Sequence, residues 1–577
     1  MTSLVDKLRG LTSADSTARG SAPAGDVKIT FSVPSPVAAE PPPDFSRLHV
    51  GRKDADQDNP VEYLALCRKE ARALSRSALA VTRRLQVTDE FAAHFVLIAA
   101  KHIRTYSSDG GIPDSDRRKD LLDMTASVLG FLIDSYKVAL KKLYGDGSAH
   151  DGAAPKELEH CAFRILELTK LQQRVLGLRY QVLPGAAWLT VNTVFHALRA
   201  AGHADAKVPP LETELLEDND TKPQSVADMF LAVQMIGRFD ILRWPTEMHQ
   251  FIFAYCKSIN WLAALSADGG APLARNTSVA YCYDTQAART TRAAANSGLG
   301  LSVLINWGKL VRKITNDMIV FFGASTRADL NYFQKRLEMM TYNECLALVQ
   351  LQFDCFTNER QHAAVDAGRG DACDLRIFIG FKSVYQLLQN IHMGKFGVGT
   401  RLADVLAKRS AIFADDDVAS VESVWFLQYE DNQILRLKTQ ESNFTTAMRI
   451  GMMSAYGVGE DGIAKPRFGM ISRIFRPAPQ TVIVDIVKYG EYVEPAVVSS
   501  DPTAFDKEDR VAGLLLAAIL VKDAHGEVKL LLPPLSTMRE QADLTMKRTQ
   551  ARQPIRLGKL QTVTRDFFLF RLARPAA

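Results

Sequence analysis

The chain has 577 residues, of which 47% are hydrophobic and 23% are charged, and a net charge of +5. At about 100–200 residues per domain, this length predicts two to four domains. The composition is typical of a globular protein and excludes a mainly disordered, collagen-like or coiled-coil chain. Because the net charge is small for this length, we expect no nucleic-acid partner that covers the whole surface.

Cysteine usage and hydropathy indicate the compartment. The seven cysteines are widely spaced and form no CxxC pair, which argues against a disulfide framework or a zinc ribbon. No apolar run reaches the length of about 18 residues that a membrane-spanning helix needs. The opening residues MTSLVDKLRGL lack the basic and then apolar regions of a secretory signal. We therefore expect a reduced, cytoplasmic protein without a membrane-spanning segment.

Residues 1–47 are rich in Ala, Ser, Pro and Gly and are predicted to be a disordered tail. From Asn59-Pro60 onward, apolar residues recur at helical spacing, with Pro60 at the first helical position. Helices are predicted from Pro60, from Asp89, over 121–144, twice within 157–200 with a break at Pro184, and then over 224–237, 245–265, 297–321 and 326–358. The pattern predicts an all-helical region over residues 48–366.

The pattern changes after residue 366. RIFIGF (376–381) predicts a short strand and residues 383–393 a helix. Eight or nine alternating segments follow, and they predict antiparallel strands in a small β-barrel or in two packed barrels over residues 370–577. These segments lie at 421–429, 433–440, 445–453, 467–475, 481–489, 513–521, 527–533, 554–560 and 566–573. The expected fold class is multidomain α + β, with a large all-α N-terminal region before the barrel.

Motifs for catalysis are missing from the sequence. There is no GxxxxGK[ST], GxSxG or HExxH motif and no EF-hand loop, and the eleven histidines are scattered. We therefore predict no enzyme, no metal site and no cofactor. A GxGxxG string occurs at Gly457, Gly459 and Gly462, but a strand follows it where a dinucleotide site needs a helix. Our interpretation is a hairpin loop.

Two basic features leave their roles open. Arg68, Arg72 and Arg76 share one helix face at i, i+4 and i+8, as either a solvated face or a site for an acidic or phosphate-bearing partner. Residues 535–577 contain nine basic and three acidic residues, a net charge of +6. They predict either the solvated outer face of barrel strands or a site for an anionic ligand.

Several stretches together resemble a known group of proteins. They are Leu178–Pro184 with Trp188 and Phe195–Leu198 in the helical part, then Asp374–Gln386, Trp425 on an opening strand, and the hairpin of Phe468–Arg476 with Thr481–Val487. The combination resembles proteobacterial proteins with a long helical N-terminal region and a C-terminal PilZ-type β-barrel. The resemblance implies a regulator that binds cyclic di-GMP.

PilZ barrels bind this nucleotide through RxxxR before the first strand and [D/N]xSxxG after a later one. Here Lys408-Arg409 alone stands near the first position. The second motif is degenerate, with Gln440 for Asp or Asn, Ser442 retained and Thr445 for Gly. The resemblance therefore implies an atypical or degenerate nucleotide site. Its candidate residues are Arg409, Arg436, Gln440, Ser442 and Arg449.

We expect a non-enzymatic regulatory or adaptor protein with protein partners and with cyclic di-GMP as the candidate ligand. The alternatives are a helical scaffold in a multiprotein assembly with no nucleotide ligand, and an enzyme with an unrecognised site. The helical region is expected to supply the main contact surface. Its candidate anchors are Trp188, Trp244, Trp261 and the stripe of Arg68, Arg72 and Arg76.

Overall fold

A computed structural model gives the fold of the chain. It describes residues 31–35, 60–107, 116–144, 155–211, 222–238, 241–267, 277–281, 302–313, 316, 371–373, 375–392, 424–458, 466–478, 480–490, 492–506, 515–522, 526–534, 540–548, 551–564 and 566–573. The described residues up to 316 belong to one compact unit, called here the helical unit. Those from 371 onward belong to a second compact unit, called here the β unit.

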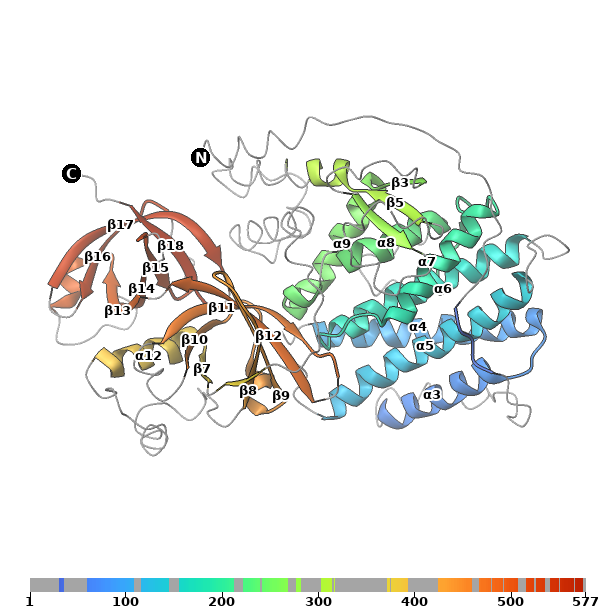
Figure 1. Cartoon of the computed structure of the whole chain (residues 1–577), viewed down its shortest axis with the longest axis horizontal. Helices are drawn as coiled ribbons and strands as arrows, with labels where there is room; N and C mark the ends of the chain where they lie inside the picture. The colour runs from blue at the N-terminus through green and yellow to red at the C-terminus, as the bar shows by residue number, and fades with distance from the viewer. Residues whose placement is uncertain are drawn as a thin grey trace. The chain divides into compact units, whose positions relative to one another are not determined.

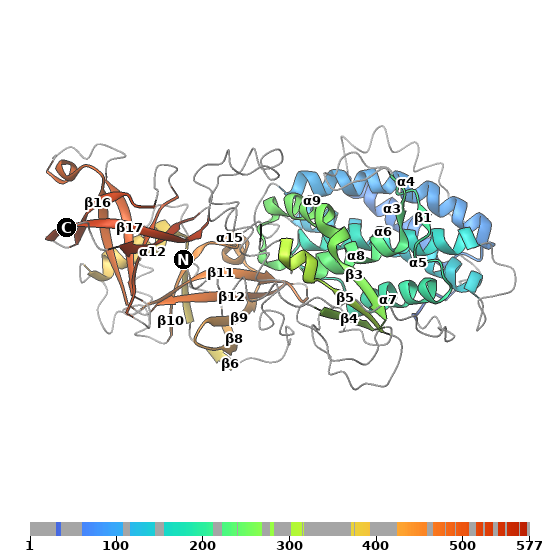
Figure 2. The same ribbon diagram turned by 90° about the horizontal axis from the view of Figure 1, so that it is seen from above.

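The helical unit is built on seven α-helices of eleven or more residues among its described residues. They are α3 (Pro60–Arg76), α4 (Val81–Tyr106), α5 (Asp116–Tyr144), α6 (Pro155–Gly177), α7 (Gly185–Ala200), α8 (Val226–Arg238) and α9 (His249–Ile259). Figures 1 and 2 show α3 to α6 packed side by side. The start at Pro60 and the break at Pro184 are confirmed. Of the tail predicted over 1–47, only residues 31–35 are described, and within them Phe31 is buried.

The predicted helix start at Asp89 is wrong, because α4 begins at Val81 and passes straight through that residue. Asp is a common N-cap because its side chain can accept a hydrogen bond from the next turn. In this fold the Asp89 carboxylate is used elsewhere. Tyr136 of α5 donates to it at 2.5 Å, and His160 of α6 lies 2.8 Å from it. Asp89 therefore contacts α5 and α6 and does not cap a helix.

The helical unit also contains strands, which corrects the all-α prediction. β3 (Ala264–Ala267), β4 (Thr277–Tyr281) and β5 (Ser302–Asn306) form an antiparallel sheet in the order β3-β5-β4, and β1 (Lys207–Val208) pairs with β2 (Gln224–Ser225). Three 3₁₀ turns occur at Ile241–Arg243, Thr246–Met248 and Asn260–Leu262. The helices predicted over 245–265 and 297–321 therefore give way in part to β3 and β5. A short apolar run such as SVLIN (302–306) can form either a helix or a strand, and here its pairing with β3 and β4 makes it a strand. The helix predicted over 326–358 lies outside the described residues.

The first part of the β unit is a seven-stranded antiparallel sheet with the strand order β6-β8-β9-β12-β11-β10-β7. Its elements are β6 (Asp371–Cys373), β7 (Leu375–Ile379), α12 (Phe381–His392), β8 (Trp425–Glu430), β9 (Ile434–Gln440), α15 (Asn443–Ala447), β10 (Met453–Val458), β11 (Arg467–Phe475) and β12 (Thr481–Gly490). The strand at 376–381 and the helix at 383–393 are thus confirmed as β7 and α12. The predicted hairpin is confirmed in its strands, because β10, which contains Gly457, pairs antiparallel with β11; Gly459 and Gly462 lie outside the described residues.

The second part of the β unit is a closed six-stranded antiparallel barrel, β13-β14-β15-β18-β17-β16. Its elements are β13 (Tyr492–Ser499), a 3₁₀ turn (Pro502–Phe505), β14 (Leu516–Lys522), β15 (Val528–Leu532), β16 (Asp543–Arg548), β17 (Ala551–Val563) and β18 (Phe568–Ala573). β13 and β16 were not predicted. The strand predicted at 445–453 is wrong over most of its length, because it contains the end of α15 and a turn before β10 begins.

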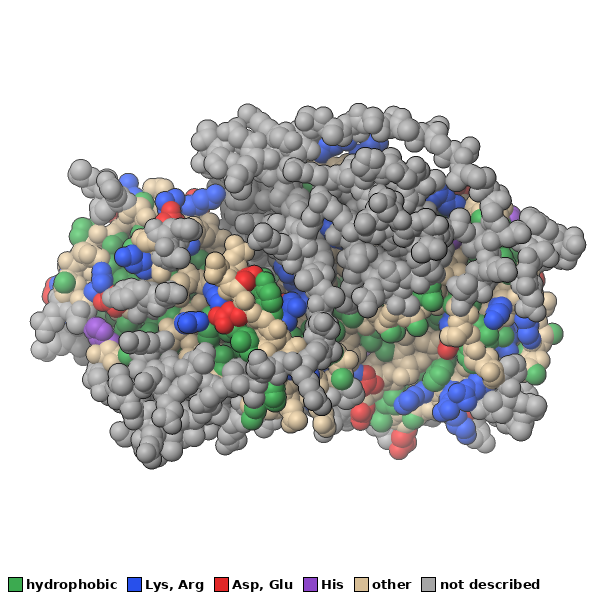
Figure 3. Space-filling view, viewed as in Figure 1, with side chains coloured by type: hydrophobic (Ala, Val, Ile, Leu, Met, Phe, Trp, Pro, Cys, Tyr) green, Lys and Arg blue, Asp and Glu red, His purple; other side chains and the backbone are tan. Residues whose placement is uncertain are grey.

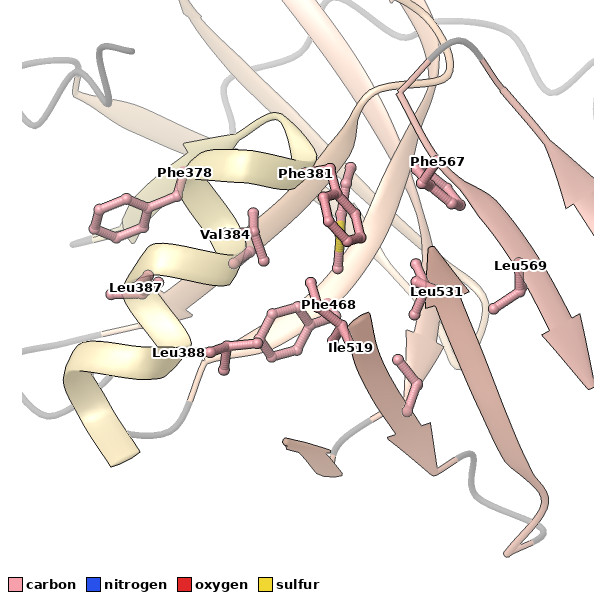
Figure 4. Packing of buried hydrophobic residues seen from close by; sticks show 13 residues of the cluster. Phe378, Phe381, Val384, Leu387, Leu388, Phe468, Ile519, Leu531, Phe567 and Leu569 are labelled. Atoms are coloured by element: carbon pink, nitrogen blue, oxygen red, sulfur yellow. The ribbon is translucent and has the colours of Figure 1, made fainter. Parts of the chain in front are cut away.

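One hydrophobic cluster joins the sheet to the barrel (Figure 4). α12 contributes Val384, Leu387 and Leu388, and the barrel contributes residues that include Phe567 and Leu569. Beside the cluster, the Asp566 carboxylate of the β17–β18 hairpin accepts hydrogen bonds from the backbone N–H of Phe381 at 3.0 Å and of Met453 at 2.7 Å. The hairpin loop of the barrel thus holds the start of α12 and the start of β10.

Candidate functional site

The structure describes four of the five residues expected at a nucleotide site, and all four lie in or beside the seven-stranded sheet. Arg436 and Gln440 belong to β9, Ser442 precedes α15 and Arg449 follows it. Arg409 lies outside the described residues. The closed barrel begins only at Tyr492, so the four described residues are not part of it. Trp425, which we predicted to lie on the opening strand of the barrel, lies in β8 of the sheet.

Arg436 forms a two-pronged ion pair across the sheet. Its Nε donates to Asp485 Oδ1 at 2.7 Å and its Nη2 donates to Asp485 Oδ2 at 2.9 Å. The two residues are direct neighbours in the β9–β12 ladder, and the Asp485 side chain is 4% exposed. Paired forks of this kind are the strongest charge-assisted hydrogen bonds in proteins. The guanidinium of Arg436 is therefore already occupied by a carboxylate.

Ser442 has a structural role at the start of α15. Its Oγ accepts from the Thr445 backbone N–H, while Thr445 Oγ1 accepts from the Ser442 N–H at 2.8 Å, which completes a capping box. The serine of the degenerate [D/N]xSxxG motif is thus explained by helix capping alone. Gln440 is the exposed last residue of β9. Arg449 donates to the carbonyl oxygens of Thr446 at 3.5 Å and Ala447 at 3.3 Å, near the end of the same short helix.

A second buried ion pair lies next to these residues. Arg476, at the end of β11, donates to the carboxylate of Glu441, and both side chains are almost fully buried. The Trp425 ring meets the Phe444 ring edge-on at 6.5 Å and closes the same region with apolar surface. The half-buried Arg436 and the buried Arg476 therefore both face carboxylates. Of the expected residues, Gln440 and Arg449 remain able to reach a ligand.

Three residues of this arrangement were missed in the sequence: Asp485, Glu441 and Arg476. Asp485 carries a readable signal, since it is the one charged residue within the apolar run TVIVDIV, and a carboxylate in a buried strand needs a partner. Glu441 and Arg476 carry no such signal, because both lie at strand ends, where charged residues are common.

In the helical unit, the tryptophans expected as contact anchors separate into two groups. Trp188 and Trp244 are buried, at 4% and 2% exposure, and belong to the core. Trp261 is 75% exposed and remains available for contact. In the stripe, Arg68 and Arg72 are exposed and Arg76 is half-buried. The stripe therefore lies on the surface.

Among the described residues of the basic C-terminal segment, four arginines pair with neighbouring acids. Arg556 forms a two-pronged pair with Asp543 at 2.7 and 2.8 Å, and Arg571 meets Glu527 at 2.5 Å. Arg552 donates to Asp506, which holds the pKa of that carboxyl below its ordinary value through this hydrogen bond. The arrangement fits the solvated outer face of barrel strands, which was the first of the two interpretations.

Across the described residues, no group of three His, Cys, Asp or Glu side chains is placed to hold a metal ion. No helix among them is both long enough and apolar enough to cross a membrane. The thiols of Cys67 and Cys161 are buried, and burial raises the pKa of each. A thiol with a raised pKa is a poor nucleophile.

Comparison with known proteins gives one match. Residues 52–268 match the family described as "Cyclic-di-GMP receptor FimW, N-terminal domain". The match covers less than half of the chain and runs from the approach to α3 to the end of β3. No curated protein and no solved structure matches the chain significantly. The chain is thus similar in its helical unit to the N-terminal domain of a cyclic-di-GMP receptor.

Proposed function

We propose that this protein is a non-enzymatic regulator that responds to cyclic di-GMP and passes the signal on by binding other proteins in the cytoplasm. The observation that carries the proposal is the similarity of residues 52–268 to the N-terminal domain of a cyclic-di-GMP receptor. The closed six-stranded antiparallel barrel at the C-terminal end adds support, because a PilZ-type protein has a β-barrel there.

We further propose that the nucleotide site is atypical and weak. Two arginines near the expected position, the half-buried Arg436 and the buried Arg476, are held by Asp485 and Glu441. A phosphate that competed for either guanidinium would leave a buried carboxylate without its partner, which is strongly unfavourable. Each missing charge-assisted bond removes about 1.5–3 kcal/mol of binding free energy. Of the residues expected at the site, Arg409 and Arg449 are the cations that would hold the phosphates.

The test is calorimetric titration of the full chain with cyclic di-GMP, with cyclic di-AMP as the specificity control. We expect saturable binding that is weaker than in a PilZ domain with both motifs. Arg409→Ala and Arg449→Ala should each weaken it. Arg467→Ala is the matched control, since Arg467 is an exposed arginine of the same sheet and pairs with Glu430 at 3.3 Å. Absence of heat at the highest soluble concentration would refute the proposal.

The alternative is a helical scaffold with no nucleotide ligand, and the two carboxylate-bound arginines favour it. The response to added cyclic di-GMP distinguishes the regulator from the scaffold. A regulator should change its protein contacts or its hydrogen exchange when cyclic di-GMP is added, whereas a scaffold should show the same exchange with and without the nucleotide.

A further inference from the structure

The surface of α3 carries a row of cations that the proposed nucleotide site does not use. Arg68, Arg72 and Arg76 repeat at every fourth residue, so the row extends for about 12 Å along the helix. The figures place many lysine and arginine side chains over the part of the helical unit that contains α3 (Figures 1 and 3). These arginines take part in none of the ion pairs formed among the described residues.

The connection from α3 to α4 extends this row. Residues 71–88 contain four arginines and no acidic residue. Arg83 lies exposed in the first turn of α4, which has no acidic residue and no side-chain cap. The N-terminus of a helix already has partial positive charge, so a cation there is unfavourable for the isolated helix. From α5, Lys142 Nζ reaches the carbonyl of Leu79 in the connection, at 3.4 Å.

A buried residue makes this surface rigid. Arg84, fully buried, donates to the carbonyl of Leu74 at 2.7 Å, to the carbonyl of Ser77 and to Ser135 Oγ of α5 at 3.2 Å. It thus fixes the end of α3 and the start of α4 against α5. We call Arg68, Arg72, Arg76, Arg83 and Lys142 the basic face.

The chemistry of the basic face selects among anionic partners. The other exposed residues of α3, the connection and the first turns of α4 are polar or small: Glu62, Ala65, Lys69, Ala78, Ala80, Thr82 and Gln86. The large apolar side chains that are exposed in the described chain lie elsewhere. A bilayer surface is normally met by apolar side chains that enter it, and single-stranded nucleic acid by aromatic ones that stack on bases. Arginine supplies a planar fork that fits a carboxylate with two hydrogen bonds. A helix with glutamates at every fourth residue would present carboxylates at the same spacing as the arginines.

We propose that the basic face docks an acidic helix of a protein partner, with carboxylates of that helix bound by Arg68, Arg72 and Arg76. The inference rests on the proposed function, because it names the kind of protein that such a regulator would bind. The exposed row supplies the ion pairs, and the positive end of α4 with Arg83 extends the field that attracts the partner.

The experiment measures fluorescence anisotropy of the full chain with two labelled peptides of identical composition. One has glutamates at every fourth position, and the other has them shuffled out of register. We expect tighter binding of the matched peptide, weakened by salt. Arg68→Gln/Arg72→Gln/Arg76→Gln should reduce its affinity about tenfold or more, and the three Arg→Lys changes should cause a smaller loss because charge remains but the fork does not.

The control variant is Arg552→Gln/Arg556→Gln/Arg571→Gln, which removes three arginines from the barrel surface and should leave peptide binding unchanged. Circular dichroism and melting temperature verify that both triple variants fold. Equal affinity for the two peptides, no binding of either, or an equal loss in the control would overturn the proposal. Tighter binding of phosphatidylserine vesicles or duplex DNA, lost in the α3 variant, would also overturn it in favour of those partners.

Calorimetry with cyclic di-GMP on the same α3 variant separates this inference from the proposed function. If the wild-type chain binds the matched peptide but no nucleotide, the proposed function fails and the docking surface stands. If nucleotide binds and neither peptide does, the docking surface fails alone.

Discussion

One arginine in each unit shows two ways of satisfying a guanidinium: Arg84 of the helical unit uses carbonyl oxygens and Arg436 of the β unit uses a carboxylate. Arg84 of α4 donates to the carbonyls of Leu74 and Ser77, where α3 ends. Arg436 of β9 meets the carboxylate of Asp485 on the neighbouring strand. The last carbonyls of a helix have no intrahelical donor and can accept from a cation, whereas the backbone groups of a central strand are used by the ladder. Because the ladder uses the backbone groups around Arg436, an acid on the neighbouring strand satisfies its guanidinium.

The same difference extends to the surface. Barrel arginines have acids as cross-strand or diagonal neighbours, as Arg556 has Asp543 and Arg548 has Glu494. The α3 row has no acid on its own connection. These two barrel arginines are each paired with an acid, whereas Arg68, Arg72 and Arg76 take part in none of the ion pairs formed among the described residues.

The strongest challenge to this comparison is Arg84→Ala. The change leaves a cavity and removes a charged donor from the carbonyls of Leu74 and Ser77, of which the Leu74 carbonyl still accepts from Ser77. We therefore expect a loss of about 3–5 kcal/mol in the free energy of unfolding of the helical unit. Hydrogen exchange resolved by peptide should show the loss across α3, α4 and α5. Unchanged exchange in the β unit serves as the internal control. A loss spread equally over both units would contradict the assignment.

Acidification should weaken the helical unit through His249. Burial lowers the pKa of this histidine to about 4 from its ordinary 6.5, and it lies with Nε2 3.1 Å from the Trp244 carbonyl. Between these values the unfolded chain binds a proton and the folded chain does not, so stability falls as pH drops from 6.5 to 4, by up to about 3 kcal/mol. Denaturant titrations at several pH values measure this slope. In His249→Gln the slope should be reduced, and an unchanged slope would assign it to other groups.

Asp485→Asn tests the acid that the sheet requires. Arg436 would keep its position but lose the carboxylate, and we expect the β unit to lose about 2 kcal/mol of stability. Arg556→Ala in the barrel is the matched control at an exposed pair, where we expect no measurable change in melting temperature. Similar losses in the two variants would mean that burial is not what makes the Arg436–Asp485 pair matter.

Asp566→Asn should have the smallest effect, about 1 kcal/mol at neutral pH, because an amide oxygen can still accept from one of the two backbone N–H groups. Burial raises the pKa of Asp566 above its ordinary 3.8. The folded chain then holds the proton to higher pH than the unfolded chain, so this group's contribution to stability falls as pH rises through its folded pKa. The slope is opposite in sign to that of His249. Denaturant titrations of the variant between pH 3 and 7 should lack it, and a retained slope would contradict its origin.

Much of the fold was readable from the sequence. Pro60 and Pro184 gave the starts of α3 and α7, because these signals act within one or two turns of chain. Alternation gave most strands of the β unit for the same local reason. The candidate site was less accessible. Ser442 satisfied a motif pattern, yet its hydroxyl caps a helix, and Arg436 was assigned to a ligand although Asp485 already holds it.

What the sequence by itself determined is therefore local: where helices and strands begin, and that two segments are strongly basic. The tertiary structure decided which strands close into a barrel, since β12 ends at Gly490 and β13 begins at Tyr492 with an uninterrupted strand pattern. A Cβ at Gly490 would lie 2.5 Å from the Lys522 carbonyl oxygen, a close approach set by strands far apart in sequence. The tertiary structure also decided which arginines pair with acids. Strand order and ion pairing depend on contacts between residues that lie dozens of positions apart in the sequence. Periodicity within one segment does not predict such contacts.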